Sequence, residues 1–241
     1  MRFDAPMTPS PAGPENPFGA PSEKPVLCYV TDRKALRVPA PAQALRGTVA
    51  AAVGAGVDWV QIREKDLPAR ELLELVRAAV AVADQSPHAP RSRVLVNDRL
   101  DVALAAGAAG VHLGGESLPA GEVVRWCRSG NAPPHFLVGV SCHSLAQARE
   151  AESAGASYIF FGPIFDTPSK REFGPPQGIP ALVEVCRAIK LPVIAIGGVS
   201  ASNGAECIRA GAAGIAAIRL FQEQRHAEAL RRVVEQLHGC G

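Results

Sequence analysis

The chain has 241 residues, of which 47% are hydrophobic, with 25 Lys and Arg against 23 Asp and Glu. A formal net charge of +2, without long runs of like charge, argues against a nucleic-acid partner. No uninterrupted apolar run reaches the length of about 18 residues that a membrane-spanning helix needs, and six scattered cysteines without a Cys-x-x-Cys pair favour a reducing, cytoplasmic setting.

The first 24 residues are rich in proline and polar residues and lack the continuous apolar segment of a secretory signal. We therefore expect residues 1–24 to form a mobile extension. The remainder, residues 25–241, is close to the length of about 250 residues that a single (β/α)8 TIM barrel uses. We expect one catalytic domain of the α/β class there.

Short runs rich in β-branched residues alternate along the chain with segments of helical periodicity. The runs predict strands at 25–32, 58–65, 93–98, 110–114, 135–141, 157–165, 191–199 and 214–220. The periodic segments predict helices at 43–55, 70–83, 119–128, 145–154, 179–189, 201–210 and 223–237, with a short one at 100–106. Glycines suited to left-handed helix C-caps follow four of these helices, at Gly56, Gly107, Gly155 and Gly211. Eight strands in this alternation predict a (β/α)8 barrel.

The second predicted strand ends in polar side chains that share one face. In such a barrel the reacting groups lie at the carboxyl ends of the strands. Because side chains alternate along a strand, Gln61, Arg63 and Lys65 point the same way, and we expect that direction to be inward. Arg63 and Lys65 would then bind phosphate or diphosphate oxygens, although a solvated strand end explains the same residues.

The third predicted strand ends in Asn97 and Asp98, an amide and a carboxylate at the same end of the barrel. Magnesium usually takes one or two protein carboxylates and completes its shell with water and substrate phosphate. Asp98 is therefore a candidate Mg²⁺ ligand. A cap on the following helix explains Asp98 equally well from spacing alone.

Two further segments have the composition of a phosphate site. Gly197 and Gly198 follow the seventh predicted strand and lead into a helix, and Ile218 and Arg219 lie near the end of the eighth. Loops after strands seven and eight bind phosphate in many barrels, and glycine lets backbone N–H groups approach the oxygens. We expect substrate phosphate to bind here.

The long loop after the sixth predicted strand is polar and rich in Gly and Pro. Thr167, Ser169 and Lys170 in this loop could add donors to a phosphate or diphosphate group. A solvated surface loop without a ligand is the alternative.

The fifth predicted strand ends near Ser141 and His143, and His143 is a candidate for proton transfer near neutral pH. A lone histidine is more often a hydrogen-bonded structural residue. His112 has small or apolar neighbours in the sequence, so we assign it to packing.

Six short motifs in order resemble the superfamily of thiamine phosphate synthases and thiazole tautomerases. They are Tyr-Val-Thr-Asp at 29–32, Gln-Ile-Arg-Glu-Lys at 61–65, Asn-Asp-Arg at 97–99, Val-His-Leu-Gly at 111–114, Gly-Pro-Ile-Phe at 162–165 and Ala-Ile-Gly-Gly at 195–198. The resemblance implies a barrel that couples an aminopyrimidine methyl diphosphate to a thiazole phosphate, the diphosphate departing first with help from Mg²⁺. It also implies roles at the site: Arg63, Lys65, Asn97 and Lys170 stabilise the leaving diphosphate, Asp98 holds the metal, and the glycine turn holds the thiazole phosphate.

The chain departs from the synthase pattern after the Val-His-Leu-Gly motif. Ser117 stands where the resemblance implies a second metal carboxylate, with Gly115 and Glu116 before it, and Arg219 replaces a small residue. This departure is similar to the sister thiazole tautomerases, in which a histidine at the position of His143 carries the proton. We favour the synthase and keep two alternatives, the tautomerase and a non-catalytic binder of phosphorylated ligands. The sequence leaves the oligomeric state open.

Overall fold

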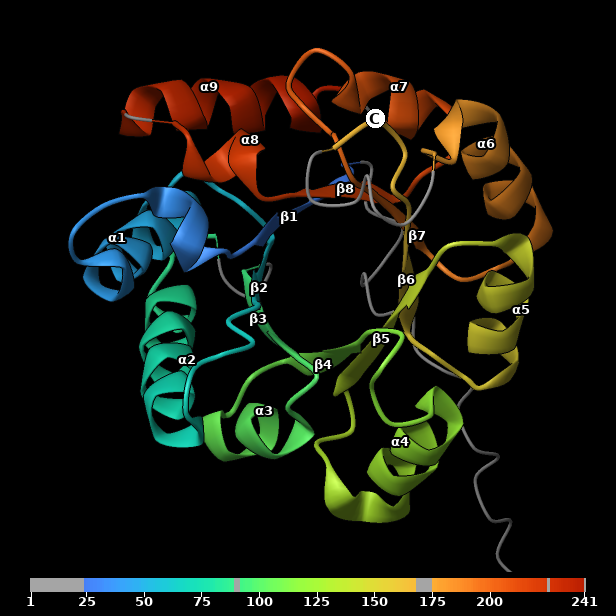
Figure 1. Ribbon diagram of the computed structural model, residues 1–241, viewed down its shortest axis with the longest axis horizontal. Coiled ribbons are helices and arrows are strands. Elements are labelled where there is room, and N and C mark those ends of the chain that lie inside the picture. Colours follow the sequence, from blue (N-terminus) through green and yellow to red (C-terminus); the bar gives the residue numbers. More distant parts are fainter. Residues whose placement is uncertain (1–23, 89–91, 168–174, 225, 241) are drawn as a thin grey trace, which may run out of the picture.

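A computed structural model of the chain describes residues 24–88, 92–167, 175–224 and 226–240. It contains a closed barrel of eight parallel strands, in which each strand pairs with the next and β8 pairs with β1 (Figure 1). Helices surround the barrel on the outside (Figure 1), so the predicted (β/α)8 fold is confirmed. Of the predicted extension, residues 1–23 lie outside the described residues.

The strands are short and evenly placed along the chain. They are β1 (Val26–Val30), β2 (Trp59–Ile62), β3 (Arg93–Asn97), β4 (Gly110–Leu113), β5 (Leu137–Cys142), β6 (Tyr158–Phe161), β7 (Val193–Ile196) and β8 (Gly214–Ala217). The α-helices are α1 (Pro41–Gly54), α2 (Ala69–Asp84), α3 (Leu100–Ala106), α4 (Ala120–Trp126), α5 (Leu145–Ser153), α6 (Gly178–Ala188), α7 (Gly204–Arg209), α8 (Arg219–Gln222) and α9 (Ala227–His238). A 3₁₀ turn, η1 (Arg33–Leu36), follows β1, and a π-helical turn, η2 (Cys127–Asn131), follows α4.

Alternation of side chains along the strands divides the apolar residues into two cores. Leu27, Val60 and Ile159 belong to the larger cluster, which lies between the strands and the helices. Trp59 and Leu95 belong to a smaller cluster inside the barrel. Because successive side chains point to opposite faces, each strand contributes to both cores. The interior of the barrel is therefore packed with side chains.

The four predicted glycine caps have the backbone conformation expected of them. The φ angles are +94° at Gly56, +71° at Gly107, +80° at Gly155 and +100° at Gly211. Each glycine ends a helix in the left-handed region, which side chains disfavour.

Several predicted elements are longer than the observed ones. The sixth strand ends at Phe161 rather than 165, and the eighth ends at Ala217 rather than 220. Ile164 and Leu220 are nevertheless buried in the outer core, so the apolar pattern continues past the last ladder residue. Periodicity alone does not separate these two cases.

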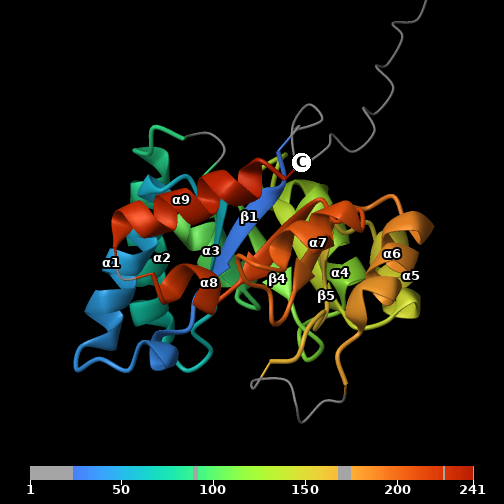
Figure 2. The ribbon, with the colours of Figure 1, turned by 90° about the horizontal axis from the view of Figure 1, so that it is seen from above.

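The carboxyl ends of the strands lie on the side of the barrel opposite to the end of the chain (Figure 2). Within the described part of the chain, no helix is long and apolar enough to cross a membrane.

Candidate active site

The interior of the barrel becomes polar toward the carboxyl ends of β2 to β5. Gln61 follows Trp59 on the inward face of β2, and Asn97 follows Leu95 on the inward face of β3. His112 lies in β4 and Ser141 in β5. The ring of strands thus places polar groups from four sequence segments above the apolar interior.

Gln61, Asn97 and Asp98 form a chain of hydrogen bonds. Gln61 Nε2 donates to Asn97 Oδ1 at 3.0 Å, and Asn97 Nδ2 donates to Asp98 Oδ2 at 2.5 Å. Gln61 is only 2% exposed, and within the described part of the chain its Oε1 atom is buried without a hydrogen-bond partner. A buried acceptor of this kind is costly unless a ligand or an ordered water supplies a donor.

Asp98 is positioned by the loops after β3 and β4. Its φ of +61° is unusual for a residue other than glycine. Its Oδ1 atom accepts the Gly114 N–H at 3.2 Å and the Ser117 hydroxyl, and Gly114 N–H also approaches Ser117 Oγ at 2.7 Å. These contacts hold the carboxylate at the mouth of the barrel.

The oxygen atoms around Asp98 suit a hard cation that needs few protein ligands. No group of three or more His, Cys, Asp and Glu that could hold a metal occurs among the described residues. Magnesium needs only one or two protein carboxylates when water and substrate phosphate complete its shell. Asp98, with the hydroxyl oxygen of Ser117 beside it, fits such a site, while Glu116 is exposed.

His112 is more than a packing residue. It is 1% exposed, Nδ1 lies 3.1 Å from the Tyr158 hydroxyl and Nε2 lies 2.9 Å from Ser141 Oγ. Burial lowers the pKa of His112 from 6.5 to about 3, so the ring is neutral at physiological pH. The neighbours of His112 in the sequence do not indicate this role, because both of its hydrogen-bond partners come from other strands. The histidine fixes the position of the Ser141 hydroxyl.

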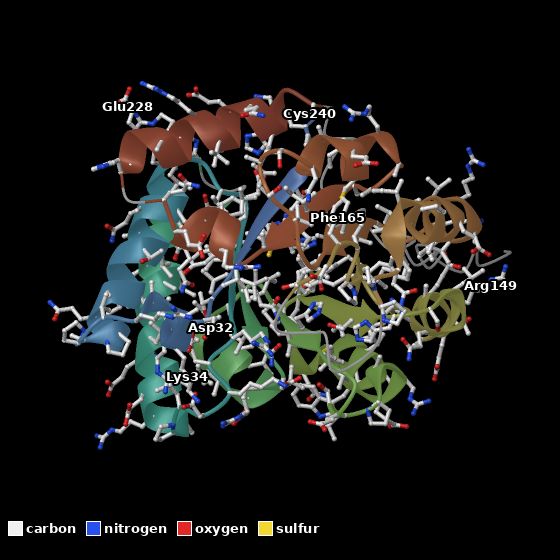
Figure 3. The ribbon with its side chains drawn as sticks, turned by 45° about the horizontal axis from the view of Figure 1, so that its top comes forward. Asp32, Lys34, Arg149, Phe165, Glu228 and Cys240 are labelled. Carbon is white, nitrogen blue, oxygen red and sulfur yellow. The ribbon has the colours of Figure 1, made fainter. Side chains whose placement is uncertain are left out.

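Glu64 anchors the cationic end of β2, a role that the sequence pattern does not indicate. Its carboxylate is 5% exposed and accepts the Thr31 hydroxyl at 2.7 Å and Arg33 Nη1 at 3.0 Å. Thr31 Oγ1 in turn accepts the Arg63 N–H at 2.9 Å. The segments after β1 and β2 are thereby joined, and Figure 3 shows Asp32 and Lys34 in the first of them. Arg63 is half-buried and Lys65 exposed beyond the strand end.

The turn after β7 packs tightly against the segment after β6. Gly197 and Gly198 have φ of +93° and +67°, and a Cβ on Gly198 would lie 2.7 Å from Phe165 Cβ. Phe165 N–H donates to Gly197 O at 2.9 Å, and Figure 3 shows Phe165 in this region. Asn203 closes the turn by accepting the Ser200 N–H at 2.7 Å. The glycines thus have a packing reason as well as the predicted ligand role.

The remaining predicted site residues differ in exposure and in their distance along the chain from the strand ends. His143 is exposed after β5, and its Nδ1 contacts Gly162 O. Ile218 packs against the inner cluster, whereas Arg219 is exposed at the start of α8 rather than in β8. Thr167 is described, but Ser169 and Lys170 lie outside the described residues.

Comparisons with known proteins agree on one family. A family model described as thiamine monophosphate synthase matches residues 27–221. The thiamine-phosphate synthase of Roseiflexus castenholzii is 39% identical over 218 residues, which are 90% of each chain. That of Methanoculleus marisnigri is 47% identical over 167 residues, 69% of this chain and 75% of the relative.

A solved structure gives the same result at the level of the fold. The thiamine phosphate pyrophosphorylase from Pyrococcus furiosus superposes with a TM-score of 0.74 and 29% sequence identity, covering 93% of this chain and 96% of its own. With the sequence matches spanning most of the barrel, the chain belongs to the thiamine monophosphate synthase family.

Proposed function

We propose that this chain works as a thiamine-phosphate synthase that joins 4-amino-2-methyl-5-hydroxymethylpyrimidine diphosphate to thiazole phosphate and releases diphosphate. The observation that carries the proposal is the connected set Gln61, Asn97, Asp98 and Ser117 at the barrel mouth. It places a buried acceptor suited to a ring amine beside a carboxylate suited to a diphosphate-bound cation. Six free cysteines support a cytoplasmic setting.

The reaction breaks the bond between the pyrimidine methylene carbon and the diphosphate oxygen, whose electron pair leaves with diphosphate. The thiazole nitrogen then donates its lone pair to that carbon, and no proton needs to move. Arg63 and Lys65 offset the charge that develops on the leaving group, with Asn97 and Lys170 as further donors. Thr31 and Glu64 support this role by fixing the backbone at Arg63.

Asp98 would hold Mg²⁺, with Ser117 beside it. When bound there, the cation supplies positive charge next to the diphosphate oxygens. The protein's own part is to hold the carboxylate in place through Gly114, Ser117 and Asn97.

The thiazole phosphate would bind at the turn after β7. Gly198 lets the backbone approach an anion closely, and Asn203 holds the turn in shape through Gly198 O at 3.1 Å. Thr167 and Ser169 from the segment after β6 add donors in this proposal. Ile218 and Arg219 follow β8, which pairs with β7, and add donors as well.

One observation favours the tautomerase as a second candidate. Because the Gly162 carbonyl only accepts, His143 Nδ1 must carry the proton in their contact. In the neutral form of this exposed ring, Nε2 then carries the lone pair that accepts a proton.

Two variants separate these candidates when a single-turnover assay of diphosphate release is run beside an assay of the unisomerised thiazole carboxylate phosphate. Arg63→Ala is expected to slow release by about a hundredfold, the scale of a lost electrostatic contact to developing charge. His143→Ala is expected to stay within a few fold of wild type. A wild type that releases no diphosphate but consumes the unisomerised thiazole, with that consumption lost in His143→Ala and kept in Arg63→Ala, would contradict the synthase and favour the tautomerase.

A further inference from the structure

The carboxylate of Asp98 determines which way two neighbouring amides face. An ionised carboxylate only accepts hydrogen bonds, so Asn97 must direct its Nδ2 toward Asp98 Oδ2 at 2.5 Å. Asn97 Oδ1 then faces Gln61 and must receive a donor, which is Gln61 Nε2 at 3.0 Å. The Oε1 atom of Gln61 is the group left over.

That remaining atom has an unused capacity to accept a hydrogen bond. Gln61 is only 2% exposed, and its Oε1 atom has no hydrogen-bond partner among the described residues. It lies on the inward face of β2, which continues from Trp59 in the inner cluster. A ligand group that donates a hydrogen bond satisfies this atom, whereas a carbonyl would oppose it.

We propose that Asp98 and Asn97 act as positioning residues that make Gln61 a hydrogen-bond acceptor. The site then selects a pyrimidine that carries an amino group over one that carries a carbonyl group. The inference rests on the proposed function, because it takes the aminopyrimidine as the ligand that meets Gln61. It adds a physical cause for the choice of substrate: the negative charge at Asp98 acts through Asn97 to fix which group Gln61 presents to the ligand.

A single isosteric change should reverse this arrangement. In Asp98→Asn, the Gly114 N–H still donates to Ser117 Oγ, so the Ser117 hydroxyl directs its proton at Oδ1 of residue 98. This leaves the new Nδ2 facing Asn97. Asn97 must then turn its Oδ1 toward residue 98 and its Nδ2 toward Gln61. Gln61 would accept that bond through Oε1 and present Nε2, a donor, to the ligand.

The test measures binding of two fragments that carry no diphosphate, so a metal is not required. The probes are 4-amino-5-hydroxymethyl-2-methylpyrimidine and its 4-oxo counterpart, titrated by calorimetry and by chemical-shift changes. Wild type is expected to bind the amine at least about tenfold more tightly, because two buried acceptors that face each other leave both without a donor. Asp98→Asn is expected to prefer the oxo compound.

Two further variants complete the design. Ser117→Ala removes a hydrogen-bond donor from Asp98 but keeps the charge, so the preference for the amine should persist. Asn97→Ala frees the Gln61 amide to turn, so the two probes should bind with nearly equal affinity. Thermal unfolding of each variant checks that it is folded. Should Asp98→Asn fail to fold, Asn97→Ala tests the same relay, by which we mean the hydrogen-bonded chain from Asp98 through Asn97 to Gln61.

The outcomes distinguish the inference from the proposed function. An unchanged preference for the amine in Asp98→Asn and Asn97→Ala would overturn the relay alone. Equal binding of both probes to a wild-type protein that still forms thiamine phosphate would also overturn only the relay. If neither probe binds wild type, the pyrimidine site falls, and the relay falls with it.

Discussion

Glu64 tolerates burial because both of its carboxylate oxygens accept hydrogen bonds. Thr31 and the Arg33 N–H donate to Oε1, and Arg33 Nη1 donates to Oε2. Arg33 also pairs with Asp66 on the surface, at 2.7 Å. One arginine therefore makes a buried and an exposed ion pair, which allows a matched comparison.

Glu64→Gln should lower the free energy of unfolding by about 2 kcal/mol, because the new amide NH2 group cannot accept from Arg33 Nη1 and a part-buried charged hydrogen bond is lost. Urea denaturation at pH 7 measures the change. Asp66→Asn is the control: Arg33 holds the pKa of Asp66 below its usual range, but Asp66 is exposed, so its replacement should matter far less. Equal losses in both variants would contradict the assignment of Glu64 as the anchor.

His112 should make the stability depend on pH in acid. Its pKa is lowered by burial to about 3 from 6.5, so below pH 6.5 the unfolded chain binds a proton that the folded chain does not. Stability contributed by the neutral ring is complete above pH 6.5 and falls as the pH drops toward 3, by up to about 1.4 kcal/mol per pH unit.

The comparison of His112→Gln with wild type isolates this effect. Denaturation between pH 7.5 and 4.5 should show a shallower fall in the variant, while His226→Gln, at an exposed position before α9, should keep the wild-type slope. Identical slopes in wild type and His112→Gln would mean that the folded protein takes up the proton at His112.

At the scale of elements, the turn after β7 depends on its contact with the segment after β6. Gly198 and Gly107 have similar φ angles, +67° and +71°, yet a Cβ on Gly107 would have no atom within 4 Å. On Gly198 it would approach Asp166 O and Phe165 Cβ, each at 2.7 Å. The two glycines therefore differ in crowding rather than in backbone conformation.

Gly107→Ala should cost about 1 kcal/mol, the usual price of a left-handed alanine. Gly198→Ala carries the same strain and must also displace the segment after β6, so it should be clearly less stable and bind inorganic phosphate more weakly. Thermal unfolding and phosphate titration provide the two measurements. Equal losses of stability in the two variants, with phosphate binding intact, would show that the close packing is unimportant.

The sequence predicts the elements better than it predicts their polar contacts. The strands appear in it as β-branched runs, and the four C-cap glycines as repeated Ala-Gly pairs. The bond between Gln61 and Asn97 depends instead on the register of β2 and β3, where Gln61 pairs with Leu95. His112 likewise meets Ser141 and Tyr158 through strands 29 and 46 residues away along the chain, a distance that no local pattern records.

At the scale of the whole molecule, closing the barrel assembles the site. Gln61, Asn97, His112 and Ser141 come from four neighbouring strands, while the glycine turn after β7 comes from the other part of the ring. Pairing of β8 with β1 completes the ring. The proposed diphosphate, metal and phosphate groups therefore meet at one mouth, which is what a coupling of two phosphorylated substrates requires.

The most direct measurement follows thiamine phosphate and diphosphate formed from the aminopyrimidine diphosphate and thiazole phosphate, with Mg²⁺ and with a chelator. A parallel reaction contains the unisomerised thiazole carboxylate phosphate alone. The account predicts equal amounts of the two products, formed only when Mg²⁺ is present, and no change in the parallel reaction. Consumption of the unisomerised thiazole without any coupling would contradict it.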